Sequence, residues 1–436
     1  MQLRFVTLLS FFALGVSLAE NPRVLAAGRI PATAVDSYGE TIGGIGSAIA
    51  VVPGGLVMLS DRGAGDGTID FRPRFQTFRL ARNGWALGLT LDHTTLLRDS
   101  NGKCFTGLLP DQAAAFPPQR GDGRMCLDPE GLAMIPGGGF FISDEYQPGI
   151  TQFGTDGSFV KRFKTPRECL PKGAGGLDFT AADEGALVSG REPNRGFEGL
   201  TLLPGGKSVA AILQSGLRQD GGRESGFSRI YIFDVKTGKA TACYMARFEE
   251  PSVIEANAPA GKEAKAKHLA FCSLEALDDG RFLAIERENF GADGSEKPEA
   301  ARWKSVVLLD CRGATNILGK KDFAGAQPAK RSVLANLAAM DTSAAGLSRE
   351  ELPAKWEGLS ISGRGDGKLR LLLSSDNDFL APELKFRGAG DRLETIGFPR
   401  VKVSQDTWVV EIEVDLPSSI ELTKNEKSQD HEKQNQ

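Results

Sequence analysis

Short apolar runs alternate with glycine-rich turns along this chain, and acidic side chains stand at the ends of the runs. In the clearest example, an apolar run at residues 197–203 is followed by Pro204-Gly205-Gly206 and a second run at 208–214. Two apolar runs joined by so short a turn are typical of a β-hairpin. Glu198 stands at the open end of this predicted hairpin.

The same arrangement recurs at four other places in the chain. These copies span residues 43–63, 128–145, 273–287 and 355–379. Repeated hairpins of this kind indicate a β architecture built by radial repetition. The sequence therefore predicts an all-β fold that is a single β-propeller with short helical insertions, with six blades favoured and seven as the alternative.

A second kind of hairpin alternates apolar and polar residues and lacks the acidic ends. It occurs at residues 72–91, around an Asn83-Gly84 turn, and again at 150–163 and 229–248. Alternation with a period of two is typical of strands. Each unit would then combine an inner hairpin that carries acids with an outer structural hairpin, which together make the four strands of a propeller blade.

Three longer stretches interrupt the hairpins. Residues 109–124 are a predicted loop rich in proline and glycine, and residues 250–268 favour a short surface helix. Residues 324–353 include a stretch at 331–337 that is expected to be helical. Insertions between blades often shape the access to a channel, and surface decoration is the alternative interpretation.

The two ends of the chain differ from the repeats. Residues 1–19 combine an early arginine, an apolar run and Ser17-Leu18-Ala19, which predicts a secretory signal peptide cleaved after Ala19. An uncleaved anchor is the alternative, but the run is short for a membrane span, and no later run is long enough. We expect a secreted or periplasmic protein with one domain at 20–417 and a disordered polar tail at 418–436.

The net charge bears on the possible partners, and the cysteine content bears on disulfides and zinc binding. The net charge is −4 and no stripe of lysine or arginine is present, so a nucleic-acid partner is disfavoured. Six cysteines follow the predicted export signal without a Cys-x-x-Cys pair, which favours disulfides over zinc. The predicted pairs are Cys104 with Cys126 and Cys272 with Cys311, and buried free thiols are the alternative.

A hairpin leaves and returns at the same end, so the acidic residues of several blades should meet at the mouth of a central channel. Carboxylates crowded together stay ionised only if a cation, arginines or backbone donors offset their charge. Their oxygen atoms suit calcium. The predicted ion ligands are Asp61, Glu130, Asp144, Glu198, Glu357 and Asp376. For any single acid, the alternative is a structural role at a strand end.

Basic side chains accompany these acids. Arg62, Arg195 and Arg287 each lie within a few residues of a carboxylate, and with Asn377 they are predicted to bind a small anionic substrate. Arginine donates two parallel hydrogen bonds to phosphate oxygens. The predicted catalytic residues are Glu130, Glu198, Arg195 and Arg287.

Several other chemistries lack the residues that they need. The chain has three histidines, no Gly-x-Ser-x-Gly elbow and no phosphate-binding Gly-x-x-x-x-Gly-Lys loop. A serine triad, a histidine base and a zinc or iron site are therefore disfavoured.

Six motifs carry a family resemblance. They are Asp128-Pro129-Glu130-Gly131, Ser143-Asp144-Glu145, Asn194-Arg195-Gly196-Phe197-Glu198-Gly199-Leu200, Glu286-Arg287, Lys355-Trp356-Glu357-Gly358 and Ser375-Asp376-Asn377-Asp378-Phe379. As a set, from about Thr41 to Phe379, the chain resembles the phytase-like family, described as having esterase-like activity of phytase. The resemblance implies an exported β-propeller domain remotely similar to the calcium-dependent β-propeller phytases. The Asp-rich calcium loops of those phytases are not recognisable here.

The leading hypothesis from the sequence is a metal-assisted hydrolase of phosphoric or related esters that uses calcium. Two alternatives stay open. One is a non-catalytic propeller that binds a ligand or partner at the same mouth, and the other is a calcium-dependent lactonase-like propeller.

Overall fold

Antiparallel hairpins dominate the regular structure of the chain in this computed structural model. It describes residues 21–183, 185–257, 263–321, 323–343, 351–387, 391–417 and 420. The predicted signal peptide at 1–19 and the predicted tail at 418–436, apart from residue 420, lie outside the described residues. The all-β prediction is confirmed for the described chain.

The first three units each contain four strands, and successive strands pair antiparallel. The first unit consists of β2 (Ala48–Val52), β3 (Gly55–Leu59), β4 (Arg74–Asn83) and β5 (Ala86–Leu96). The second consists of β6 (Pro129–Met134), β7 (Phe140–Asp144), β8 (Gly149–Phe153) and β9 (Phe159–Arg162). The third consists of β12 (Phe197–Leu202), β13 (Ser208–Leu213), β14 (Phe227–Asp234) and β15 (Lys239–Arg247).

The fourth and fifth units vary this plan. In the fourth, the inner strand is split into two short pieces, and the strands are β16 (Ala270–Phe271), β17 (Glu275–Ala276), β18 (Arg281–Arg287), β19 (Lys304–Asp310) and β20 (Lys330–Asn336). The fifth unites both ends of the described chain in β21 (Lys355–Gly365), β22 (Lys368–Asp376), β25 (Thr407–Asp415) and β1 (Arg23–Ile30).

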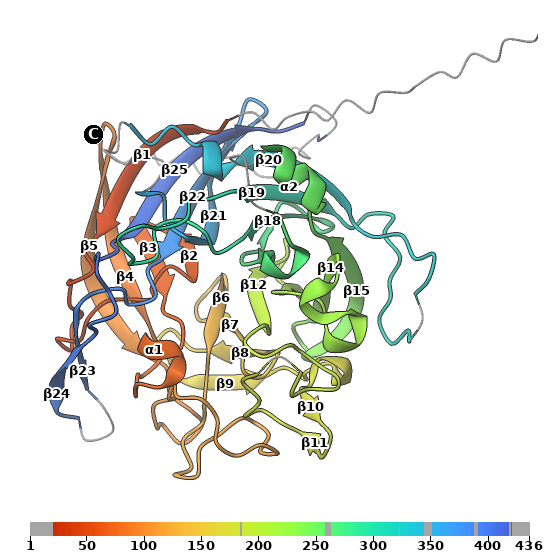
Figure 1. Ribbon diagram of the computed structural model, residues 1–436, viewed down its shortest axis with the longest axis horizontal. Coiled ribbons are helices and arrows are strands. Elements are labelled where there is room, and N and C mark those ends of the chain that lie inside the picture. The colour runs from red at the N-terminus through yellow and green to blue at the C-terminus, as the bar shows by residue number, and fades with distance from the viewer. Residues whose placement is uncertain are drawn as a thin grey trace, which may run out of the picture.

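The first strand closes the arrangement. β1 pairs antiparallel with β25, and a single parallel pair, Ala27 with Ala86, joins it to β5 of the first unit. The first and fifth units therefore belong to one eight-stranded sheet. Figure 1 shows the units arranged around a common centre, with β2, β6, β12 and β21 innermost.

Hydrophobic clusters fill the spaces between neighbouring units. Between the first and second units, for example, the Phe75 ring packs edge-on against Phe140 with centroids 4.7 Å apart. Between the fifth and first, Leu372 and Val409 pack with Met58 and Phe78. Equivalent clusters lie at the other three junctions, so each unit buries both faces against its neighbours.

The described residues form five such units, whereas the sequence favoured six. The sequence itself shows five inner hairpins, at residues 43–63, 128–145, 197–214, 273–287 and 355–379. Much of the remaining length goes into long connections, which include residues 97–128, 163–196 and 311–329.

Several short elements of secondary structure lie within the connections between strands. They include the hairpins β10 (Lys172–Gly173) with β11 (Gly176–Leu177) and β23 (Glu383–Arg387) with β24 (Leu393–Gly397), and the helices α1 (Ala64–Gly67) and α2 (Pro251–Asn257). The 3-10 turns are η1 (Arg167–Cys169), η2 (Arg218–Asp220), η3 (Gly222–Glu224), η4 (Ala266–His268) and η5 (Leu337–Ala339). None of the helices in the described chain is both long and apolar enough to cross a bilayer.

All three insertions can be compared with their predictions. Residues 109–124 contain no helix or strand, as predicted for a loop. A short helix does occur within 250–268, since α2 lies there. The prediction of a helix at 331–337 is wrong, because Lys330–Asn336 forms β20 and pairs with β19 over most of its length. The neighbouring strand supplies backbone partners that the local sequence does not reveal.

The disulfide predictions are not met, because all six cysteines are free thiols in the structure. Cys272 follows β16 and its N–H donates to Ile285 of β18, whereas the N–H of Cys311 donates to Gly280 just before β18. Five residues of a strand separate these positions, which is roughly 16 Å. The two cysteines thus lie toward opposite ends of β18, and a disulfide needs Cα atoms within about 7 Å.

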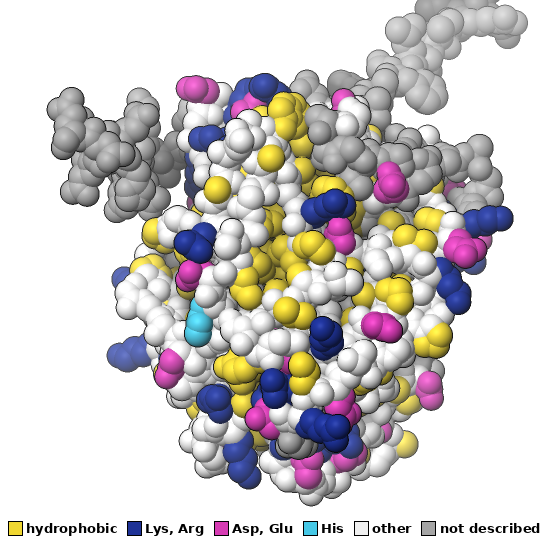
Figure 2. Space-filling view, turned by 90° about the vertical axis from the view of Figure 1, so that its left-hand side faces the viewer, with side chains coloured by type: hydrophobic (Ala, Val, Ile, Leu, Met, Phe, Trp, Pro, Cys, Tyr) yellow, Lys and Arg dark blue, Asp and Glu magenta, His cyan; other side chains and the backbone are white. Residues whose placement is uncertain are grey.

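The outer surface of the ring over β1 and β5 carries both hydrophobic and charged side chains. Figure 2 shows the face over β1 and β5, where hydrophobic side chains gather in the middle and charged side chains surround them. Trp85, in the turn between β4 and β5, is 51% exposed.

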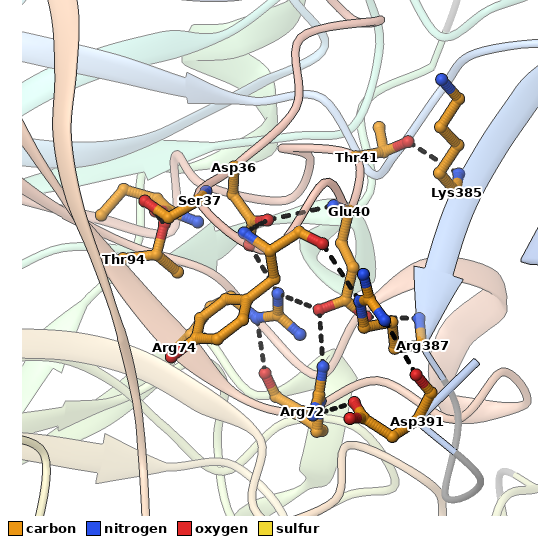
Figure 3. A network of polar contacts seen from close by, with 12 residues as sticks. Asp36, Ser37, Glu40, Thr41, Arg72, Arg74, Thr94, Lys385, Arg387 and Asp391 are labelled. Carbon is orange, nitrogen blue, oxygen red and sulfur yellow. Dashed lines mark hydrogen bonds and ion pairs between the residues drawn. The ribbon is translucent and has the colours of Figure 1, made fainter. Parts of the chain in front are cut away.

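A buried ion-pair network anchors the connection between β1 and β2 (Figure 3). Arg74 of β4 is 1% exposed, and its Nη1 lies 2.6 Å from Asp36 Oδ2 and 2.5 Å from Glu40 Oε2. Glu40 also accepts hydrogen bonds from Arg72 and from the backbone N–H of Arg387 in β23. The network therefore fixes the loop that leads to Gly43-Gly44 at the centre of the ring, together with the β23–β24 hairpin.

Replacement of Arg74 by methionine should destabilise the protein strongly. The change leaves the buried Asp36 and Glu40 carboxylates without their shared cation, and breaking a buried pair costs about 3–5 kcal/mol. Urea unfolding followed by tryptophan fluorescence would measure the loss. Arg79→Met is the matched control, since Arg79 lies on the same strand and forms an exposed pair with Asp92 that should contribute less than about 1 kcal/mol. Equal losses in the two variants would contradict a stabilising role for the network.

Candidate functional site

A pocket of about 120 Å³ lies where the inner hairpins converge, and charged side chains make most of its wall. The acidic residues that line it are Asp61, Asp66, Glu130, Glu145, Glu198, Glu357, Asp376 and Asp378. The basic residues are Arg62, Arg195, Arg223, Arg287 and Lys355. Such a pocket suits a small charged ligand rather than an apolar one.

Local irregularities of the inner strands place the three glutamates. Glu130, Glu198 and Glu357 each lie in β6, β12 or β21 at a point where the pairing with the next strand shifts register. A β-bulge of this kind changes the direction of a side chain relative to the rest of its strand. The glutamates therefore reach the central pocket, while the remaining apolar residues of these strands pack into the core.

The glycine after each glutamate allows neighbouring units to come together. A Cβ atom on Gly131 would lie 2.4 Å from the carbonyl oxygen of Glu198 in the next unit. A Cβ on Gly199 would lie 2.2 Å from the backbone of Ser273 in the unit after that. Any larger residue at these positions would push adjacent inner strands apart, so the Glu-Gly pair couples close packing to the placement of an acid.

One group of carboxylates joins the first and fifth units. Asp61, Asp376 and Asp378 offer oxygen atoms that all lie within 4.8 Å of one another. Backbone N–H groups orient them, because Asp61 Oδ1 accepts from Gly63 at 2.8 Å and Asp376 Oδ1 accepts from Asp378 at 2.8 Å. Lys355 Nζ lies 2.5 Å from Asp378 Oδ1 and offsets part of the negative charge.

A second group belongs to the second unit. Asp128, Glu130 and Glu145 offer oxygen atoms within the same 4.8 Å limit, and all three residues are buried. Arg62 Nη1 lies 2.9 Å from Asp128 Oδ2 and 3.9 Å from Glu145 Oε2. The other Glu145 oxygen, Oε1, is buried without a hydrogen-bond partner. This group therefore has an unused oxygen ligand.

Burial and mutual repulsion disturb the titration of these acids. Burial, followed by the charges of Glu198 and Asp128, raises the pKa of Glu130 well above its usual value. Burial and the nearby Glu145 and Glu357 do the same to the pKa of Glu198. Burial alone would also raise the pKa of Glu357, but Arg287 and Lys355 hold it below its usual range. Neighbouring glutamates in one pocket thus favour different protonation states.

The arginines differ in how they are engaged. Arg287 donates to Glu357 and to Asn289, and Arg62 donates to Asp128 and to Asn194. Arg195 donates to the carbonyl oxygens of Leu269 at 2.9 Å and Lys267 at 3.4 Å. In the described chain Arg195 forms no ion pair with a carboxylate, so its charge is available to an anion in the pocket.

Three residues that line the pocket have strained backbone conformations. Asp66, Asn194 and Asp378 have φ values of 53°, 52° and 48°, in the left-handed region that residues other than glycine seldom adopt. Such conformations persist only where the surrounding structure imposes them, and they cluster at binding and catalytic sites. All three residues line the central pocket.

The donor set fits a hard divalent cation. Both groups consist of carboxylates, which calcium prefers as ligands, and each brings three of them within reach of one ion. The partnerless Glu145 Oε1 is an acceptor that a cation would satisfy. The acidic residues could therefore hold a metal ion, and the oxygen-only chemistry of the set suits calcium better than zinc or copper.

Eight of the ten residues predicted from the sequence line the pocket: Asp61, Arg62, Glu130, Arg195, Glu198, Arg287, Glu357 and Asp376. Asp144 and Asn377 do not. Asp144 Oδ1 accepts from the backbone N–H groups of Asp128 and Tyr146, and Asn377 bonds the backbone of Gly44, Phe379 and Gln405. Their hydrogen bonds thus support the pocket wall from behind.

Other lining residues were not singled out from the sequence. Glu145, Lys355 and Asp378 stand inside the quoted motifs, next to predicted residues, so the alternation of side chains at a strand end could have identified them. Asp66 and Arg223 lie in connections outside those motifs. Only the folding of the connections over the ring brings them to the pocket.

Comparisons with known proteins place the chain among relatives. A 28% identical protein from Arthroderma benhamiae, described as an uncharacterized secreted protein, aligns over 68% of this chain and 69% of its own length. Solved structures with a similar backbone arrangement include a GH43 β-1,3-galactosidase with galactodeoxynojirimycin. The two sequences are 8% identical, the alignment covers 85% of this chain and 99% of that chain, and the TM-score is 0.40. The Dos1 propeller has 9% identity, 84% and 67% coverage, and a TM-score of 0.28. At these scores the likeness supports no statement about activity.

A family model matches a large part of the sequence. The phytase-like model, described as esterase-like activity of phytase, matches residues 40–379. This range begins just before Gly43-Gly44 and ends at Phe379, so it contains the eight predicted residues that line the central pocket. The chain therefore belongs to the phytase-like family.

Proposed function

We propose that this protein is an exported, single five-bladed β-propeller that uses calcium in its central pocket to hydrolyse an anionic ester. The observation that carries the proposal is the presence, around one pocket, of two three-carboxylate groups, of which five carboxylates line the pocket and Asp128 does not, and of the Arg195 guanidinium, which forms no ion pair with a carboxylate of the described chain. Membership of a family described by esterase-like activity supports the same class of reaction.

The propeller interpretation rests on closure. Each of the five units buries both faces against its neighbours, and β1 and β25 join the two ends of the chain in one unit. Such mutual dependence favours one domain at 20–417 over several independent ones. Export is supported by the predicted signal peptide and by the relative that is described as secreted.

Calcium would be held by Asp61, Asp376 and Asp378, or by Asp128, Glu130 and Glu145. A bound calcium ion would neutralise the carboxylates and polarise an ester oxygen. The chain's own cations would then orient the substrate, with Arg195 directed at the acid oxygens and Arg287 held in place by Glu357.

Two glutamates are suited to move the protons. In hydrolysis of a phosphate monoester, the oxygen of water bonds to phosphorus and the bond from phosphorus to the alcohol oxygen breaks. Glu357, whose pKa is held below its usual range by Arg287 and Lys355, would accept the proton from water. Glu198, whose pKa is raised by burial and by Glu145 and Glu357, would be protonated and would give its proton to the departing alcohol oxygen.

Replacement of Glu198 by glutamine tests the site directly. We expect the wild-type protein to release 4-nitrophenol from 4-nitrophenyl phosphate with calcium and to lose this activity in chelator. Glu198→Gln should lower kcat by about 100-fold or more, with a much smaller change in melting temperature. Glu275→Gln is the control, because Glu275 is a half-buried acid of the fourth unit outside the pocket, with a pKa that desolvation raises to about 7.

Other outcomes would select other functions. Turnover of lactones without turnover of phosphate esters would favour a lactonase. Stabilisation by calcium without turnover of either substrate would favour a binding protein. A melting temperature that collapses in Glu198→Gln, with calcium binding intact, would assign that residue a structural role.

Removal of the Arg195 charge should weaken the binding of anions. We expect Arg195→Met to raise the inhibition constant of inorganic phosphate by about tenfold or more, because a charge-assisted hydrogen bond contributes roughly 1.5–3 kcal/mol. Arg223→Met is the comparison, since Arg223 lines the same pocket and its guanidinium donates to the carbonyl oxygen of Pro193. Unchanged inhibition in Arg195→Met would exclude this residue as the anion receptor.

Calcium should stabilise the protein more at high pH than at low pH. Burial and neighbouring acids raise the pKa values of Asp61, Glu130, Glu198 and Asp376, and burial raises that of Asp128 to about 7. The folded state then binds more protons than the unfolded state. Its stability is therefore greatest below the unfolded pKa of about 4 and is lost as pH rises through about 7.

Melting temperatures in chelator should therefore fall between pH 5 and pH 8, and excess calcium should restore most of the loss at pH 8. Ligand at 100 times its dissociation constant stabilises by about 2.7 kcal/mol. Magnesium at the same concentration is the control. Identical melting temperatures with and without calcium at pH 8 would rule out a calcium site in this pocket.

A further inference from the structure

A second cavity, of about 300 Å³, adjoins the central pocket. The two share Arg62, Asp66 and Asn194 as common walls. A ligand whose charged end lies in the central pocket can therefore extend into this side cavity. The side cavity is the larger of the two and has room for an organic group.

The walls of the side cavity combine polar and apolar residues. The apolar side chains include Leu109, Tyr146, Phe179, Ala181 and Pro193, and the polar ones are Arg62, Asp66, Thr180, Arg191 and Asn194. The Tyr146 hydroxyl donates to the carbonyl oxygen of Gly107 at 2.7 Å, and the N–H of Phe179 donates to Ala113 at 3.0 Å. The 109–124 insertion and the 177–183 segment are thus tied together, and they form this wall rather than mere surface decoration.

The arginines of the side cavity are already committed to protein oxygens. Arg191 is 2% exposed and donates from Nε to the carbonyl oxygen of Tyr146 at 3.0 Å and from Nη1 to that of Glu192 at 3.1 Å. Arg62 donates to Asp128 and Asn194. Arg62 is thus paired with a carboxylate, and burial leaves little of the Arg191 guanidinium within reach of a second phosphate group.

A third cavity, of about 220 Å³, shares Lys355, Asp376 and Asp378 with the central pocket. Asp293 and Asp406 also line it, so its four carboxylates outnumber its one lysine and would repel an anionic ester. Of the two neighbouring cavities, the side cavity is therefore the one suited to the uncharged part of such a substrate.

On the basis of the proposed function, we infer that the substrate is a monoester whose alcohol part is apolar, an aryl or alkyl group that rests against Leu109, Tyr146 and Phe179. This class differs from phosphate esters of polyols that carry a phosphate on every carbon. Burial of an aryl group against these side chains should improve binding, because each square ångström of apolar surface removed from water contributes about 25 cal/mol.

Calorimetry with two phosphonates that are not hydrolysed would test the inference without relying on turnover. In buffer with calcium, phenylphosphonate should bind the wild-type protein about tenfold more tightly than methylphosphonate. Phe179→Ala should reduce this ratio to about twofold or less and leave methylphosphonate binding unchanged. Phe179→Leu, which keeps an apolar side chain, should retain most of the ratio if the alanine variant proves unstable.

Phe116→Ala is the matched control. Phe116 stacks on Phe179 with ring centroids 6.0 Å apart, but it is 51% exposed and does not line the side cavity. The phosphonate ratio should therefore persist in this variant, and a loss equal to that of Phe179→Ala would overturn the assignment of the cavity wall.

The two proposals fail in different ways. Equal wild-type affinities for phenylphosphonate and methylphosphonate would overturn the apolar subsite, even if aryl phosphate is hydrolysed. A tenfold preference that depends on Phe179 would support the subsite, even if no ester is cleaved and the hydrolase proposal fails. Failure of both phosphonates to bind would overturn both proposals.

Discussion

The close approach of the inner strands is the constraint on which the rest of this structure depends. Gly131 and Gly199 lie where a side chain would collide with the backbone of the next unit. Each follows a glutamate in a bulged strand, so the residue that permits close packing also directs an acid toward the centre. The geometry of the ring and the composition of the pocket therefore have a common origin.

The acids at the centre repel one another, and the structure offsets the charge of some of them but not of others. Arg287 and Lys355 hold Glu357 in its ionised form, whereas Glu130 and Glu198 are driven toward protonation by burial and by neighbouring acids. Buried charges are costly unless they are paired, so the remaining negative charge favours a bound cation. The same imbalance supplies an acid and a base within one pocket, which is a usual requirement for hydrolysis.

The connections between units determine what the centre can accept. Charge from the inner hairpins surrounds the pocket itself, but Leu109, Tyr146 and Phe179, which lie in connections between strands, add apolar side chains to the side cavity. The buried Arg74 network holds the loop that precedes Gly43-Gly44, and the N–H of Asp61 donates to Gly44. Rigid support of this kind is what keeps carboxylates of distant segments within a few ångströms of each other.

The recurrence of hairpins, the Glu-Gly motifs and the acids at strand ends were readable from the sequence, because hydrophobic periodicity and turn residues are local properties. These local patterns were sufficient to predict the all-β class and to identify eight of the residues that line the pocket. They did not distinguish Asp144, which caps backbone groups behind the pocket, from Glu145, which faces it. Tertiary structure decided the number of units, the strand β20, the free cysteines and the side cavity. Each of these depends on contacts between segments far apart in the chain, and no local pattern of residues specifies such contacts.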